Sequence, residues 1–189
     1  MANKRFGLEM LVMVLVFGGC VSAPQITLEQ QAEQQAWEQA NPQYTRAENF
    51  RWQIDGDGVI ITGFISGRGA LNLRIPPQIY GMPVIAIRGQ VPFRHPAFNG
   101  LGLISVTIPD SVIHIGNSAF MDNRLTEVII PDSVTYIGHS AFLRNRIGSV
   151  TVPRGTTISP RAFADQTIPG IFYTSLGHTV VRDSVVTRR

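Results

Sequence analysis

Histidine and serine are the side chains that most often carry catalysis, and their placement in this chain fits no catalytic motif. The sequence contains no His-Glu-x-x-His, no Gly-x-Ser-x-Gly, no Walker-type phosphate loop and no zinc-ligand spacing. The chain has four histidines: His95, His114, His139 and His178. Serines recur at turn positions of a repeated unit: Ser111, Ser133, Ser118 and Ser140. We therefore expect no catalytic residue, no cofactor and no small-molecule substrate.

Asp55 and Asp57 are the pair of carboxylates closest to a metal-binding pattern. A calcium loop of the EF-hand type needs oxygen ligands at later positions, which here hold Val59 and Ile61. The run Asp-Gly-Asp-Gly between alternating apolar residues predicts instead the turn of a β-hairpin. The single cysteine, Cys20, allows neither a disulfide within the chain nor a thiolate metal cluster. We expect no metal site.

Cys20 follows a segment with the layout of an export signal. Lys4 and Arg5 are followed by an apolar run over residues 10–17, which is too short to span a bilayer as a helix. Gly18 and Gly19 then precede the cysteine, and this arrangement resembles a bacterial lipobox, although Phe17 stands where an aliphatic residue is usual. We expect cleavage before Cys20 and lipidation of its thiol. The alternative is an ordinary signal peptide or an uncleaved anchor with an incidental cysteine.

A lipid at Cys20 would hold the protein at a membrane of the cell envelope. Val21 follows the cysteine, in place of the aspartate associated with retention in the inner membrane of many Gram-negative bacteria. This favours the outer membrane, with the folded part on the cell surface or on the periplasmic side.

The charge of the chain gives no sign of a nucleic-acid partner. The formal net charge is +3, and without residues 1–19 it falls to +2, with 14 basic against 12 acidic residues. The arginines are scattered through the repeats, whereas a nucleic-acid interface needs a clustered basic face. We expect no nucleic acid among the partners.

Residues 103–166 are built from a repeat of about 22 residues. The segments that begin at Leu103, Leu125 and Ile147 align, so that Pro109, Pro131 and Pro153 recur at this spacing. An Ala-Phe pair recurs with them, at residues 97–98, 119–120, 141–142 and 162–163, and one residue is lost in the last step. Self-similarity at a period of 20–29 residues predicts a solenoid of the leucine-rich-repeat type.

Each unit begins with a strand of the form L-x-x-V-x-I whose apolar residues point inward. Proline ends this strand because it has no N–H to donate, and Pro-Asp-Ser favours a β-turn. A second short extended piece follows, and Gly116 and Gly138 are expected to turn the chain before the Ala-Phe pair fills the interior. Asn123 and Asn145 come three residues after the phenylalanine, where we expect them to satisfy backbone groups of the corner rather than bind a ligand.

The flanking segments are less regular. Thr27 and Gln30 fit a capping box for a short helix that ends at Asn41-Pro42; this helix either acts as a spacer or docks on the first coil through Trp37. Residues 50–65 predict a hairpin that covers the open end of the solenoid. The next coil carries an 11-residue insertion, and the chain ends in a closing strand pair with a fraying tail from Arg182. The expected divisions are 1–19 signal peptide, 20–49 lipidated N-terminus and helical spacer, 50–102 capping hairpin and irregular first coil, 103–166 repeat array and 167–189 C-terminal cap.

The repeats SVTIPDSVIHIGNSAF and EVIIPDSVTYIGHSAFLRNR resemble the BspA-like leucine-rich-repeat family in its treponemal subclass. The resemblance covers residues 50–166. It implies a mainly β fold, a short right-handed solenoid with a parallel sheet on one face, capped by the hairpin and the short helix. Family members are typically bacterial surface or secreted proteins, and some bind host matrix proteins or other bacteria.

Function is expected to lie on the outward side of the first strand of each unit. A regular array of side chains on a rigid scaffold suits protein recognition. The candidate partner-binding residues are Asn72, Arg74, Ser105, Thr107, Glu127, Ile129, Ser149 and Thr151. The expected partner is a protein, either of a host or of the envelope, and the membrane is contacted through the lipid on Cys20. The alternative is a structural or spacer lipoprotein that faces the periplasm and has no role in adhesion.

Overall fold

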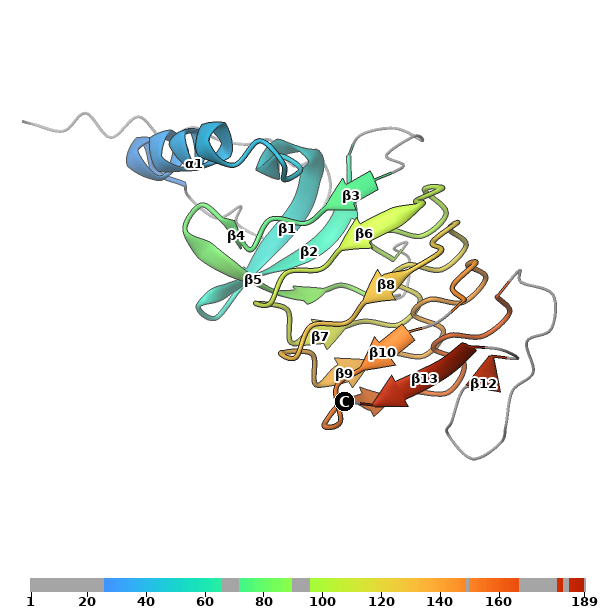
Figure 1. Ribbon diagram of the computed structural model, residues 1–189. Coiled ribbons are helices and arrows are strands. Elements are labelled where there is room, and N and C mark those ends of the chain that lie inside the picture. Colours follow the sequence, from blue (N-terminus) through green and yellow to red (C-terminus); the bar gives the residue numbers. More distant parts are fainter. Residues whose placement is uncertain are drawn as a thin grey trace, which may run out of the picture.

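The chain winds into a stack of coils whose parallel strands lie on two sides of the stack (Figure 1). The computed structural model describes residues 26–65, 72–89, 96–148 and 150–166, and the backbone of residues 180–181 and 184–188. One side of the stack carries β3 (Asn72–Arg74), β6 (Ser105–Thr107), β8 (Val128–Ile129) and β10 (Val150–Val152). The other side carries β5 (Met82–Ile87), β7 (His114–Ile115), β9 (Tyr136–Ile137) and β11 (Thr157–Ile158). The predicted solenoid is confirmed, and the second extended piece of each unit forms a sheet of its own.

Strands β6, β8 and β10 are short, and each ends one or two residues before the predicted proline. After Pro109, Pro131 and Pro153 the chain turns, and each proline carbonyl accepts a hydrogen bond from the residue three positions on, at 3.0 to 3.1 Å. This is the bond that closes a β-turn. The coil therefore changes direction at the same place in every unit, and the second strand starts on the opposite side of the stack.

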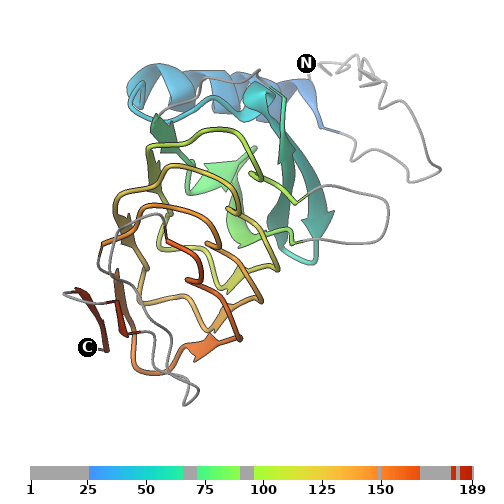
Figure 2. The same ribbon diagram turned by 90° about the vertical axis from the view of Figure 1, so that its right-hand side faces the viewer.

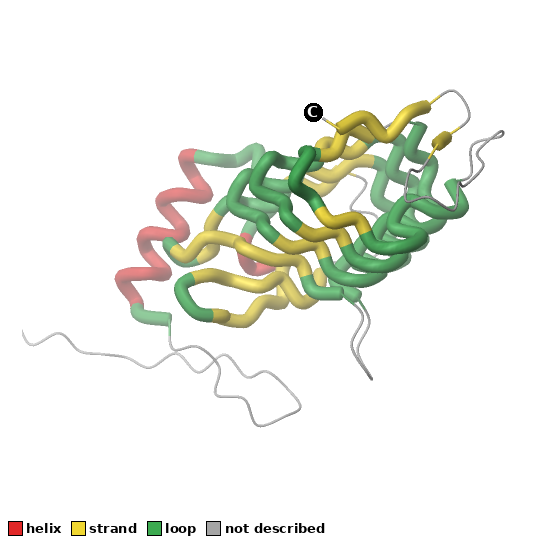
Figure 3. Tube along the Cα trace, turned by 90° about the horizontal axis from the view of Figure 1, so that it is seen from below, coloured by secondary structure: helices red, strands yellow, loops and turns green. Residues whose placement is uncertain are grey.

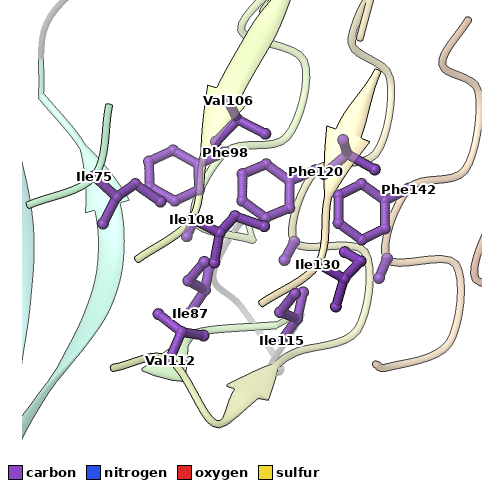
Figure 4. Close-up of a cluster of buried hydrophobic side chains, with 14 of the residues drawn as sticks. Ile75, Ile87, Phe98, Val106, Ile108, Val112, Ile115, Phe120, Ile130 and Phe142 are labelled. Carbon is purple, nitrogen blue, oxygen red and sulfur yellow. The ribbon is translucent and has the colours of Figure 1, made fainter. Parts of the chain in front are cut away.

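The interior is filled by columns of identical or similar side chains, one from each coil. The Leu/Ile, Val and Ile/Val columns of the first strand are all at most 8% exposed. The Phe98, Phe120, Phe142 and Phe163 rings stack with centroids 5.1 Å apart and nearly parallel planes, at 12°, 7° and 1°. Figure 4 shows the first three of these rings in a row, with isoleucines and valines around them. The prediction that Ala-Phe fills the interior is confirmed.

Gly116 and Gly138 lie at the corner where a turn was predicted. Neither glycine has a positive φ; the left-handed residues of this corner are Ser118 and Ser140, at φ 57° and 56°. The glycines are needed because adjacent coils approach closely there. A Cβ on Gly116 would lie 2.1 Å from the backbone nitrogen of Gly89, and one on Gly138 would lie 2.5 Å from that of Asn117.

Replacing Gly116 by alanine is therefore expected to lower the free energy of unfolding by about 1–3 kcal/mol, because the added methyl group meets backbone that cannot rotate away. Urea unfolding measures the loss. Gly155→Ala is the matched control, since a Cβ at Gly155 has no atom within 4 Å and its φ is not positive. It should leave stability unchanged or raise it by about 0.4–1 kcal/mol. Equal stabilities for the two variants would contradict the close approach.

A hairpin covers the N-terminal end of the stack, as predicted. Strands β1 (Phe50–Asp55) and β2 (Gly58–Phe64) pair antiparallel around Gly56-Asp57, and β2 continues the second sheet by pairing parallel with β5. Phe50 and Phe64 close the end of the phenylalanine stack, with ring centroids 6.2 and 6.3 Å from that of Phe98. Phe50 is tilted 89° to Phe98, an edge-to-face contact that gives the first ring of the stack a partner.

The N-terminal helix α1 (Leu28–Ala40) has the predicted capping box and ends at the C-cap Asn41. It lies across the N-terminal end of the stack (Figures 2 and 3), so of the two placements left open it takes the docked one. The contact is polar. The Gln34 side chain, 5% exposed, accepts a hydrogen bond from the backbone N–H of Tyr80 at 2.7 Å. Trp37, the expected anchor, contacts Tyr44 of its own segment, with the rings 5.5 Å apart.

The insertion in the first coil is divided between two places. The offset between paired residues is 33 at β3/β6 and 28 at β5/β7, and it falls to the regular 22 at Ala97/Ala119. The first part is a small antiparallel turn between β4 (Gln78–Ile79) and β5, which holds Tyr80 and Gly81 at positive φ. The second part falls between Ile87 and Ala97. Together the two parts account for the predicted 11 residues.

The C-terminal strands differ in part from the prediction. β12 (Val180–Val181) is present, but it pairs antiparallel with β13 (Ser184–Arg188), which lies where a fraying tail was expected. β13 runs parallel to β10, with Val150 opposite Val186, and so takes the position of a next coil on that sheet. The other predicted closing strand, at residues 171–173, lies outside the residues described.

Candidate functional site

The side chains that point outward from β3, β6, β8 and β10 form one surface, which we call the strand face. Strand alternation explains it, because Leu73, Val106, Val128 and Val150 point inward and are buried. Their neighbours point to solvent. All the predicted face residues that the structure describes are exposed: Asn72, Arg74, Ser105, Thr107, Glu127, Ile129 and Thr151. Ser149 and the proposed lipidation site Cys20 lie outside the residues described.

Strand register aligns several of these residues side by side. Asn72 is paired with Ser105, whose hydroxyl donates to the Asn72 side-chain oxygen at 2.7 Å, and Arg74 is paired with Thr107. Ile129 is paired with Thr151 on β10. The ladder is interrupted between β6 and β8, since β6 pairs with β3 and β8 pairs with β10. The strand face therefore consists of two halves that meet at this interruption.

A groove lies along the interruption between β6 and β8. Thr107 and Ile129 line it. Val106 and Ile108 also line it, although their side chains are only 8% and 5% exposed. Ile129 is 69% exposed, the largest exposure among the large apolar side chains that the structure describes. Asp110 and Asp132, from the turns after the two strands, line the same groove.

The two aspartates were missed as site residues from the sequence. Asp110 and Asp132 occupy the middle of the Pro-Asp-Ser turns, a position that turn formation alone explains. Both are exposed, and the following serines do structural work: the Ser133 hydroxyl donates to the Val112 carbonyl at 2.7 Å. Asp110, Asp132 and Arg154 occupy the same position in three successive units, directly after the proline. The change from acidic to basic at this exposed position is the signal that could have identified the aspartates.

The corner asparagines are structural, as predicted. Each side-chain amide donates to the phenylalanine carbonyls of its own and the preceding unit, and it accepts from the backbone N–H of the first residue of its own unit. For Asn145 these partners are Phe142 and Phe120, both at 2.9 Å, and Leu125 at 3.1 Å. Gln166 makes the equivalent bonds at the last described corner, accepting from Ile147 at 2.9 Å and donating to Phe142 at 2.9 Å. Gln166 was not predicted from the sequence as part of this series.

The second sheet carries an aromatic stack on its outer side. The His114 ring lies 4.4 Å from the Tyr136 ring, and the Tyr136 hydroxyl is hydrogen-bonded to Ser159 at 2.9 Å. Partial burial lowers the pKa of His114 below its ordinary value, because the charged imidazolium would lose hydration in this position. The stack packs together two residues that are paired in register on β7 and β9.

Within the parts of the chain that are described, no group of three or more His, Cys, Asp or Glu side chains is placed to hold a metal ion. Asp55 and Asp57 flank the β1–β2 turn, with Asp55 in register with Gly58. In the same described parts, none of the helices has the length and apolar character needed to cross a membrane.

Comparison with known proteins finds a family model that resembles the coils. Residues 92–183, just under half of the chain, match the model of a BspA type leucine-rich repeat region in six copies. No curated protein matches the chain. Two crystal structures are similar to it, both of leucine-rich-repeat proteins. The T. pallidum protein TpLRR is 24% identical, with a TM-score of 0.49 over 65% of this chain and 67% of that one. The Bacteroides ovatus protein is 20% identical, with a TM-score of 0.38 over 59% of this chain and 36% of that one.

The family match agrees with the geometry of the coils. Its range begins in the first coil and includes the three 22-residue units, the phenylalanine stack and the residues of β12. A first strand, a proline turn, a second strand and a phenylalanine corner recur in each unit. Residues 92–183 are therefore similar to a BspA type leucine-rich repeat region, and the coils have the leucine-rich-repeat fold.

Proposed function

We propose that this chain is a non-enzymatic lipoprotein of the cell envelope whose strand face binds another protein. The observation that carries the proposal is the exposed apolar side chain of Ile129, set in a groove of an otherwise polar sheet face. Leucine-rich-repeat regions generally act as protein-binding modules. Their stacked strands present side chains on a surface that does not have to reorganise on binding.

The rigidity of the strand face supports a binding role. Beneath it, the stacked phenylalanines and the corner amides fix the distance between coils, so that the outward side chains keep their spacing. A preorganised surface loses less conformational entropy when a partner docks. An exposed apolar residue surrounded by polar ones is also the usual composition of a binding hot spot with its rim.

The sequence before the helix supports a membrane anchor. The basic residues Lys4 and Arg5, the apolar run over residues 10–17 and the Gly18-Gly19-Cys20 sequence are the three parts of a lipoprotein signal. We infer that Cys20 carries the lipid and that the solenoid stands on the outer membrane. Metabolic labelling with a radioactive or alkyne-tagged fatty acid tests this, and Cys20→Ala is the control that should lose the label.

Charge and bulk placed on the strand face are expected to abolish partner binding. The test variant is Thr107→Glu/Ile129→Glu/Thr151→Glu in the full chain, compared with Thr135→Glu/Thr157→Glu on the opposite sheet, where both threonines are also exposed. Cross-linking in intact cells followed by purification should recover the partner with the wild type and the control, and not with the face variant. The thermal unfolding temperatures should agree within a few degrees, because surface substitutions usually change stability by at most about 0.5 kcal/mol. Undiminished binding by the face variant would refute the proposal.

Protease treatment of intact cells separates surface display from a periplasmic position. Loss of the solenoid supports a binding role outside the cell. Complete protection, with digestion only after the outer membrane is opened, supports the structural or spacer role on the periplasmic side.

A further inference from the structure

We propose that the groove between β6 and β8 is a docking site for an extended protein segment that carries both apolar and basic side chains. This inference rests on the proposed protein-binding function and names the chemistry of the partner. It is carried by two independent properties of the groove, an exposed apolar contact and a local negative charge.

The apolar contact comes from both strands. Ile129 of β8 is 69% exposed, and Val106 of β6 and the following Ile108, which are 8% and 5% exposed, also line the groove. Contact between this exposed apolar side chain and an apolar side chain of a partner removes apolar surface from water, which lowers the free energy of the complex. The contact is confined to one place, because the other described residues of the strand face are polar or charged.

The charge of the groove is opposite to that of the chain. Asp110 and Asp132 line it, and none of its lining residues is basic, although the chain as a whole has more basic than acidic residues. The negative charge is also local. Arg154 occupies the position of Asp132 in the next coil, and Arg74 lies beside Thr107 on the other side. A basic side chain of the partner is therefore directed to the two carboxylates and away from either flank.

An extended segment fits this arrangement better than a small molecule or a metal ion. The groove runs beside two strands and offers an apolar contact and a charge contact at different points along it. In an extended peptide, alternate side chains point the same way, so that one apolar and one basic residue can face the groove together. Among the residues described, Asp110 and Asp132 belong to no group that could hold a metal ion.

The test uses three ten-residue peptides with a fluorescent label. In the first peptide, every second residue is serine and the residues between are leucine and lysine. The second peptide has glutamine in place of each lysine, and the third has glutamate in place of each lysine. Fluorescence polarisation with the full chain should show binding of the lysine peptide that weakens as salt is raised. Ile129→Ser should weaken binding at least about tenfold, as should Asp110→Lys/Asp132→Lys. The double charge reversal should in addition shift the preference to the glutamate peptide.

Glu127→Lys is the matched control. Glu127 is an exposed acid on the strand face that does not line the groove, so its reversal should leave peptide binding within about twofold. Thermal unfolding verifies that every variant folds, and Asp110→Asn/Asp132→Asn replaces the lysine variant if that one does not. The inference is overturned if the lysine peptide does not bind, if the glutamate peptide binds equally well, or if Glu127→Lys weakens binding as much as the groove variants. The failure of this inference can be told apart from the failure of the proposed function. If one of these results is obtained while Thr107→Glu/Ile129→Glu/Thr151→Glu still abolishes capture of the partner in cells, the groove is not the peptide site but the proposed protein-binding function stands.

Discussion

Replacing Phe142 by alanine is expected to lower the free energy of unfolding by about 3–5 kcal/mol. Phe142 is fully buried, and its ring stacks between those of Phe120 and Phe163 at 5.1 Å on each side. The cavity left by the ring cannot collapse easily, since hydrogen bonds between coils hold the flanking backbones apart. The Phe142 N–H donates to the Ala162 carbonyl at 2.7 Å, and the Phe120 N–H donates to the Ala141 carbonyl at 2.8 Å.

Urea unfolding of the full chain, followed by circular dichroism, measures this loss. Phe142→Leu serves as the graded control, because leucine keeps part of the apolar volume and its stability should fall between those of the wild type and the alanine variant. The solenoid also predicts that the damage spreads, since each coil is supported only by its neighbours. An alanine variant within about 1 kcal/mol of the wild type would show that the ring stack adds little beyond the rest of the core.

The repeated part of the fold could be predicted from the sequence because every coil places the same residue type in the same surroundings. The phenylalanine column is visible as Ala-Phe at residues 97–98, 119–120, 141–142 and 162–163, and the structure stacks these rings. The capping hairpin was also predictable, from the alternation around Gly56-Asp57 and from the need to cover an open coil. Recurrence turned weak local signals into a strong one.

The features that occur once in the chain were harder to predict. Helix α1 docks through Gln34, a polar residue whose partner is a backbone N–H 46 positions away, and no local pattern indicates such a contact. The closing strand β13 lies in a segment that resembles a polar tail. Gly116 was assigned to the corner correctly, but a glycine that permits a turn and one that permits close approach of two backbones are identical in sequence.

The candidate site also has a part that could be predicted from the sequence and a part that could not. Exposure of residues such as Thr107 and Ile129 follows from strand alternation, and it is confirmed for each predicted face residue within the described segments. The groove could not be predicted in this way, because it depends on how strands of two different coils are spaced. Asp110 and Asp132 line the groove from turns, and turn formation alone is enough to explain an aspartate at these positions. A site formed between repeats therefore has no signature within one repeat.

Removal of a corner amide gives the second large effect. Asn145→Ala is expected to cost about 2–6 kcal/mol. It leaves the Leu125 N–H without its acceptor, at about 1–3 kcal/mol, and it removes one hydrogen bond from each of the Phe120 and Phe142 carbonyls, at about 0.5–1.5 kcal/mol each, although Asn123 and Gln166 still donate to these carbonyls. Asn145 has no exposed surface, so water cannot replace the amide without reorganisation. Asn117→Ala is the matched control. Asn117 is exposed, and its side-chain oxygen accepts a hydrogen bond from the His139 N–H at 2.9 Å. It should lose no more than about 1 kcal/mol.

Asn145→Asp tests the donor role alone, through its dependence on pH. The introduced carboxyl keeps an oxygen for the Leu125 N–H, but when ionised it has no hydrogen to give to the two carbonyls. Burial in this corner raises the pKa of that carboxyl above the value of about 3.9 that it has in the unfolded chain. The unfolded state therefore releases the proton more readily, and the variant must lose stability as the pH rises above about 4. Urea midpoints at pH 4, 5.5 and 7 should fall steadily for the variant relative to the wild type. A constant difference between the two would mean that the buried amide acts by shape and not by its hydrogen bonds.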